Sequence, residues 1–174
     1  MKSMKNLQNF SEDDDRIPYK TILSTASRWK FEWKFIDDPI LLTNISYHLL
    51  YIDFLISTYN TYRLYGVIES LISKDIIIKV NDIIESVLHH LLVKYESKEN
   101  IPYIELIGKA YKEHKIISKE LWHQIHELRK LRNLRHIQSV DKSELDVYKI
   151  ENANDSLSIL DEFREEIEEY TKKS

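Results

Sequence analysis

The fold of this chain is decided by one stretch, Asp75-Ile-Ile-Ile-Lys-Val-Asn-Asp-Ile-Ile-Glu-Ser-Val-Leu-His-His-Leu-Leu-Val-Lys-Tyr95. Its apolar residues recur three and four positions apart, the period at which side chains of an α-helix return to the same face. The stretch therefore predicts a long amphipathic helix over 75–95 that buries one face against neighbouring helices. That face consists of Ile77, Val80, Ile84, Val87, Leu88, Leu91 and Tyr95.

The composition agrees with an all-α protein. The chain has 174 residues, which fits one domain with a core of its own. Hydrophobic residues make up 43% and charged residues 31%, as in ordinary globular domains, whereas two glycines and three prolines are too few for a turn-rich β protein. Because the chain has no cysteine, disulfides, thiolate nucleophiles and cysteine-bound zinc are excluded.

Three further helices are predicted before residue 138. Asp38-Pro39 is typical of a helix start and opens an apolar-periodic segment over 39–72, which we expect to bend near Gly66. A short helix follows over 103–114. Ser118 can then cap a fourth helix that runs to about 137.

A last helix is predicted after Asn154 or Asp155, either of which can cap it. We therefore expect an up-and-down bundle of four long helices and one short helix over 39–174. Residues 1–38 form an N-terminal extension whose structure the sequence leaves open.

The functional lead is a polar stripe on the helix predicted to end near 137. At about 100° per residue, Arg129, Arg132, Asn133 and His136 fall within an arc of about 100°, which a helix normally gives to its apolar face. Burying a charge costs several kcal/mol unless it is paired. Ionisable groups on a stripe that faces the core therefore indicate a site.

These residue types suffice for RNA cleavage without a metal. Arg129 and Arg132 offer forked cations for phosphate oxygens, and His136 can move a proton near neutral pH. A base would remove the 2′-hydroxyl proton, and a cation would stabilise the charge on the phosphorane. The alternative is structural: the two arginines pair with acids such as Glu85 or Glu165 and Glu166 in a bundle without catalysis.

Three residues are candidates for supporting roles at this site. His126 lies at the edge of the stripe, while Asn81 falls inside the apolar arc of the 75–95 helix and Glu85 at its edge. His123 and His126 also have a spacing that suits a metal, but His123 belongs to an outward arc that is typical of a solvated surface. We expect neither a metal nor a cofactor. Trp29 and Trp33, four residues apart among basic residues, are candidate contacts with RNA or with a partner.

One segment carries a resemblance to a known family: Leu106-Ile-Gly-Lys-Ala-Tyr-Lys-Glu-His-Lys-Ile-Ile-Ser-Lys-Glu-Leu-Trp-His-Gln-Ile-His-Glu-Leu-Arg-Lys-Leu-Arg-Asn-Leu-Arg-His136. It is similar to the third and fourth helices of HEPN domains, whose motif is an arginine followed, after about four to six residues, by a histidine. Six residues separate Arg129 from His136, whereas Arg132-Asn133 matches a frequent dipeptide of the motif but lies only three residues before His136. Which arginine is equivalent stays open.

Two more segments extend the resemblance over roughly residues 40–170. Ile83–Leu88 is similar to the family's second helix, and Val147–Leu160 resembles the lead-in to its last helix. The resemblance implies a homodimer whose paired motifs face a common cleft. It also implies one of two functions: a metal-independent endoribonuclease of toxin–antitoxin or phage-defence systems, or a non-catalytic interaction module. The implied partners are RNA and a cognate antitoxin or nucleotidyltransferase.

Charge and hydropathy limit where such a protein acts. The net charge of −4 argues against coating nucleic acid through bulk electrostatics, so a contact with RNA must be local. We expect a cytoplasmic protein without a membrane segment, since the N-terminus has no apolar signal core and no run of 18 uncharged apolar residues occurs.

Overall fold

The computed structural model describes residues 25–62, 64–95, 101–134 and 147–173, and every regular element in these residues is a helix. The all-α prediction is confirmed. In chain order the helices are α1 (Ala26–Glu32), α2 (Pro39–Thr61), α3 (Val67–Leu92), α4 (Tyr103–Lys112), α5 (Lys119–Asn133) and α7 (Ile150–Lys173).

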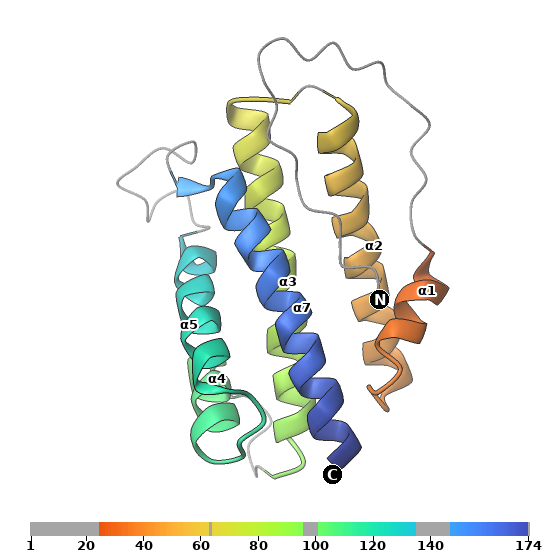
Figure 1. Ribbon diagram of the computed structural model, residues 1–174, viewed down its shortest axis with the longest axis vertical. Coiled ribbons are helices and arrows are strands. Elements are labelled where there is room, and N and C mark those ends of the chain that lie inside the picture. The colour runs from red at the N-terminus through yellow and green to blue at the C-terminus, as the bar shows by residue number, and fades with distance from the viewer. Residues whose placement is uncertain (1–24, 63, 96–100, 135–146, 174) are drawn as a thin grey trace.

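The helix that the opening stretch predicts is the centre of the bundle. α3 packs against α2, α4, α5 and α7. Figure 1 shows α3 and α7 in the middle, with α1 and α2 on one side and α4 and α5 on the other. The largest fully buried side chains of this core include Leu49, Ile52, Ile56, Ile76, Ile77, Ile83, Ile84, Leu88, Leu92 and Phe163.

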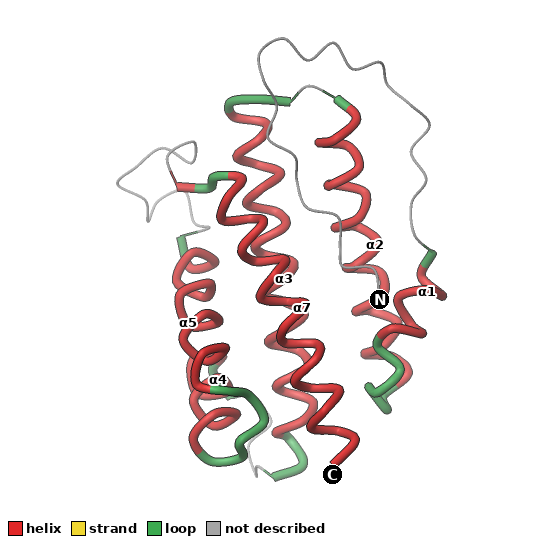
Figure 2. The backbone as a smooth tube through the Cα atoms, viewed as in Figure 1, coloured by secondary structure: helices red, strands yellow, loops and turns green. Residues whose placement is uncertain are grey.

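The first two predicted helices divide at a different place. α2 begins as predicted, with the Asp38 side chain accepting hydrogen bonds from the Ile40 and Leu41 amides at 2.8 and 3.0 Å. It ends at Thr61, and α3 already starts at Val67, so the expected bend near Gly66 is a complete break. α2 ends because the Tyr62 backbone is extended, with φ −105° and ψ 143°, and Gly66, whose φ is 64°, directly precedes the first residue of α3. Figure 2 shows the loop between the two helices.

The last helix also starts earlier than predicted. α7 begins at Ile150 rather than after Asn154 or Asp155. The Asn152 side chain accepts a hydrogen bond from the Lys149 amide at 3.3 Å, which satisfies a donor at the helix start. The side chains that α7 buries are Ile150, Ala153, Leu157, Leu160, Phe163 and Ile167, together with Ser156 and Arg164.

The N-terminal extension contributes a helix to the bundle. Within its described part, α1 packs against α2, and Trp29 and Trp33 are only 3% and 1% exposed. These indoles belong to the core, so neither Trp29 nor Trp33 contacts RNA. The sequence predicted five helices because this short segment shows no clear period.

One side of α2 remains outside the core. Tyr47, Tyr51 and Phe54 recur along it and are exposed, and Ile68 and Leu71 at the start of α3 are exposed as well. By length and composition alone, α2 is the one helix in the described part of the chain that is apolar enough to cross a membrane. Its other side, however, carries core residues of the bundle.

Candidate functional site

The candidate site is assembled around α5, whose position is fixed at both ends. Its first turn is capped by Ser118, whose hydroxyl accepts a hydrogen bond from the Leu121 amide at 3.1 Å. The Ser118 amide itself donates to Glu166 of α7 at 2.7 Å. Near the other end, the Tyr148 hydroxyl donates to the Leu131 carbonyl at 3.2 Å.

Arg132 points from α5 towards α3 and is held there by two carboxylates. Its Nη2 atom lies 2.7 Å from Oε2 of Glu85 and 3.4 Å from Oδ1 of Asp82. The Arg132 side chain is 17% exposed, so water screens this pair only partly. Of the acids that the sequence offered, Glu85 is the partner, whereas Glu166 binds the Ser118 amide.

Arg129, one turn earlier, has different surroundings. Its side chain is half-buried, and its Nε atom is buried without a hydrogen-bond partner. In the described part of the chain, no carboxylate lies within ion-pair distance of Arg129, and its positive charge is not neutralised there. The two arginines of the stripe are therefore not equivalent.

Tyr103, at the start of α4, lies against Arg132. Its ring centroid is 5.4 Å from the guanidinium carbon of Arg132, a cation–π contact. Its hydroxyl is buried and has no hydrogen-bond partner. Burial raises the pKa of the Tyr103 phenol, the negative charge of Glu85 adds to this, and Arg132 and Arg129 oppose it. The phenol thus lies within the electrostatic field of the whole cluster.

Asn81 connects α3 to α5 beneath the arginines. It is fully buried, and its side-chain amide donates to the Ile77 carbonyl at 2.9 Å and to the Leu128 carbonyl at 3.4 Å. Its Oδ1 atom has no partner. The cluster therefore contains unsatisfied donors on Arg129 and Arg132 and an unsatisfied acceptor on Asn81, a group of exceptions that is unusual for a core.

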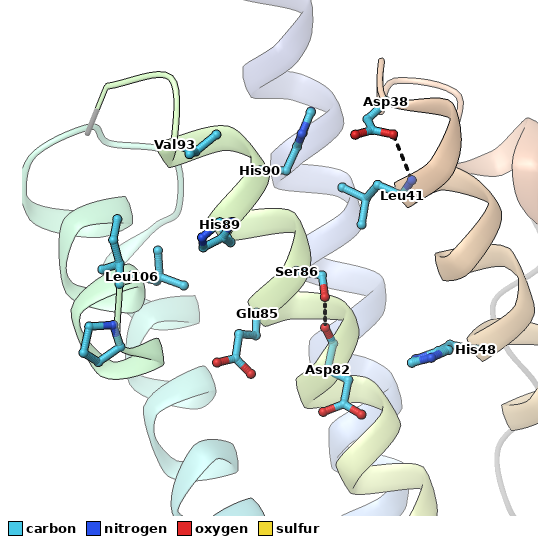
Figure 3. A pocket seen from close by; sticks show the side chains of 12 residues that line it. Asp38, Leu41, His48, Asp82, Glu85, Ser86, His89, His90, Val93 and Leu106 are labelled. Atoms are coloured by element: carbon cyan, nitrogen blue, oxygen red, sulfur yellow. Dashed lines mark hydrogen bonds between the residues drawn. The ribbon is translucent and has the colours of Figure 1, made fainter. Parts of the chain in front are cut away.

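An open pocket of about 970 Å³ adjoins this cluster between α2, α3 and α4. Asp82 and Glu85, the two partners of Arg132, lie on its wall. Figure 3 shows three histidines of the same pocket, His48 from α2 and His89 and His90 from α3. Burial lowers the pKa of His48, and the nearby charge of Lys79 lowers it further.

The remaining predicted residues lie apart from this cluster or outside the described residues. His126 is stacked near Trp122, with ring centroids 6.1 Å apart, and Asn133 is exposed at the last position of α5. α5 ends at Asn133 instead of continuing to about 137, and His136 lies outside the described residues.

Sequence reasoning missed two members of the cluster, Asp82 and Tyr103. Asp82 lies three positions before Glu85, so both can reach one neighbour of α3, and this spacing is a usable signal. Tyr103 gave no signal, because a tyrosine at the start of an amphipathic helix is usually a packing residue. Within the described ranges, no three His, Asp or Glu side chains are arranged to hold a metal ion.

Comparisons with protein-family models, with curated proteins and with solved structures found no match to this chain. The similarity to HEPN domains therefore depends on the sequence motif and the helix order given above, and it stays a prediction.

Proposed function

We propose that this protein is a HEPN-like endoribonuclease that cuts RNA without a metal, and that Arg129 is the arginine of its motif. The observation that supports this choice is the difference between the two arginines. Arg132 is neutralised by Glu85 and Asp82, whereas Arg129 has no carboxylate partner among the described residues. A phosphate needs an uncompensated cation, and Arg129 offers one at the six-residue spacing from His136.

In this proposal each residue has a separate task. Arg129 binds the scissile phosphate and stabilises the charge that develops on its oxygens. His136 removes the proton of the 2′-hydroxyl or donates one to the leaving 5′-oxygen. Arg132 is a positioning residue, because its pairing with Glu85 holds α5, the helix that carries Arg129, against α3.

The proposed assembly is a homodimer. One helix supplies only one wall of a phosphate site, so a second copy related by two-fold symmetry would complete the cleft with its own Arg129 and His136. Light scattering on purified protein tests this directly, since the 20.9 kDa chain would give about twice that mass in solution.

The test of activity is incubation with mixed cellular RNA in excess chelator, followed by analysis of the product ends. Wild-type protein should leave 2′,3′-cyclic phosphate ends, whereas Arg129→Ala and His136→Ala should cut at least about 100-fold more slowly. Lys130→Ala is the matched control, because it removes a cation of the same helix that is already paired with Glu127 at 2.6 Å. Equal cutting by folded Arg129→Ala and wild type would refute the assignment of Arg129.

A second candidate function is a non-catalytic interaction module, and two observations favour it. Arg132 is paired as in a structural polar network, and one side of α2 exposes three aromatic side chains, Tyr47, Tyr51 and Phe54. In this case no cutting occurs, and substitution of Tyr47 and Phe54 by serine abolishes capture of a partner by the full chain. The two candidates thus predict loss of function from opposite sides of the molecule.

A further inference from the structure

A second group of polar and aromatic side chains lies on the flank of α5 that faces α4, and it shares Arg129 with the Arg132 cluster. Trp122, His126, Arg129 and Asn133 recur at intervals of four, three and four residues, so at about 100° per residue they fall within roughly 60° of one another. None of the four is buried. This flank is continuous with the proposed catalytic arginine.

The N-terminal half of the flank is an array of stacked rings. Trp122 stacks with Tyr111 of α4, with centroids 5.3 Å apart, and with His126, 6.1 Å away. Trp122 is half-buried, in contrast to the fully packed Trp29 and Trp33. An indole that retains exposed ring surface beside another aromatic ring is the usual platform for an unpaired base.

Lysines surround these rings. Lys112 Nζ lies 5.7 Å from the Trp122 ring centroid, and Lys115 Nζ lies 5.2 Å from that of Tyr111. Both lysines are exposed. From Tyr103 to Leu134 the chain has seven Lys or Arg against four Glu, although the whole protein carries a net charge of −4. The positive charge is thus concentrated on the α4–α5 pair, which suits a polyanion.

We infer that the α4–α5 flank binds a single-stranded segment of RNA next to the cleavage site. A base stacks on Trp122 and displaces Lys112, whose ammonium group then contacts a neighbouring phosphate. The strand continues along α5 for about 10 Å, the rise of seven helical residues, and reaches Arg129. This inference rests on the proposed function and deepens it, because it restricts the substrate to unpaired RNA: a duplex does not offer base faces for stacking.

Binding is measured with His136→Ala protein, which keeps the flank but should not cut, and a labelled RNA of about 12 nucleotides without secondary structure. The expected results are quenching of Trp122 fluorescence and an affinity that falls steeply with salt. Trp122→Leu should weaken binding about tenfold, whereas Trp122→Phe, which keeps a ring, should stay within about threefold. DNA of the same sequence should bind this variant as well and should stay uncut with wild-type protein, whereas duplex RNA should not quench.

Lys112→Ala and Lys130→Ala are a matched pair, since each removes one exposed lysine and only the first lies over Trp122. A clearly larger loss of RNA affinity for Lys112→Ala supports base stacking on Trp122 even if Trp122→Leu does not fold. Equal losses, or no quenching by any single strand, overturn it. If wild type cuts RNA and Trp122→Leu binds RNA as tightly as the parent protein, only the proposed base-stacking site is refuted. If wild type binds RNA but does not cut it, only the proposed ribonuclease activity is refuted.

Discussion

Two polar attachments hold neighbouring segments to α3, one on each side of the same pocket, and they differ in burial. At one end Arg132 of α5 binds Glu85 and Asp82, with side chains only 17%, 30% and 26% exposed. At the other, Asp37 before α2 binds His90 at 2.7 Å and Lys94 at 3.2 Å, although its own side chain is 69% exposed. The ion-pair distances are similar, but the carboxylate of Asp37 is much more exposed to solvent than those of Glu85 and Asp82.

This difference separates a fixed attachment from one that responds to conditions. A half-buried guanidinium is charged at every accessible pH, and loss of its partners leaves an uncompensated charge in a poor solvent. An exposed carboxylate is screened by water and salt, so its pairing adds at most about 1 kcal/mol. We therefore expect the Arg132 attachment to hold α5 against α3 under all conditions. The Asp37 attachment, at the edge of the pocket, should weaken with salt and acid.

The largest expected effect follows from breaking the buried attachment. Arg132→Met keeps much of the side-chain volume but leaves Glu85 without its cation, while Asp82 keeps only its pairing with Lys79 at 3.4 Å. It should lower the free energy of unfolding by about 2 kcal/mol, below the 3–5 kcal/mol of fully buried pairs because these groups are partly exposed. For a domain of this size that corresponds to a Tm lower by about 4 to 8 °C in thermal unfolding.

A double-mutant cycle distinguishes the ion pair from simple packing. Glu85→Gln in the Arg132→Met background should cost clearly less than Glu85→Gln in the wild type, because the carboxylate no longer has a partner to lose. Strictly additive costs would show that Arg132 stabilises α5 through other contacts, such as that with the Tyr103 ring, and not through its ion pair with Glu85.

The sequence predicts some helices and helix ends of this protein correctly and others not. The period of the 75–95 stretch correctly predicted a central helix, although α3 starts eight residues earlier, at Val67. Asp38 and Ser118 correctly marked two helix starts, since such starts depend on local chemistry. The end of α2 was wrong because an apolar pattern continues through Gly66, whereas the backbone leaves the helical conformation already at Tyr62.

The site was predicted in part. The stripe indicated Arg129 and Arg132, and Glu85 was among the proposed partners. A helical wheel could not show that one arginine is neutralised and the other is not, because that depends on which helix packs alongside α5 and at what register. Tyr103 joins the cluster for the same reason, through the packing of α4 on α5.

A smaller effect is expected at the exposed attachment, and it depends on pH. The hydrogen bond from His90 holds the pKa of Asp37 below its ordinary value of 3.8, with Lys94 acting in the same direction. A depressed carboxyl pKa stabilises the folded state above the unfolded pKa, and this contribution is lost as the pH falls through the folded pKa. Asp37→Asn should therefore cost less than about 1 kcal/mol at pH 7 and nothing well below pH 3.

Urea unfolding of wild type and Asp37→Asn at several pH values checks this expectation. The two stability curves should be separated at pH 5 and converge in acid. A gap that persists at low pH would mean that Asp37 acts through the backbone conformation before α2 and not through its charge.

The smallest expected effect concerns the Tyr103 hydroxyl. In contrast to the charged groups of the two attachments, this hydroxyl has no hydrogen-bond partner. It is also buried, so it bears a desolvation cost that the phenyl ring of Tyr103→Phe would not. The ring would keep its contact with Arg132, and the free energy of unfolding should stay the same or rise by up to about 1 kcal/mol. If Tyr103→Phe instead loses stability, the hydroxyl has a partner in solution, such as an ordered water next to Arg129. If Tyr103→Phe keeps its stability but cuts RNA more slowly, the hydroxyl contributes to activity and not to folding. Its hydrogen-bond partner would then be the phosphate of bound RNA.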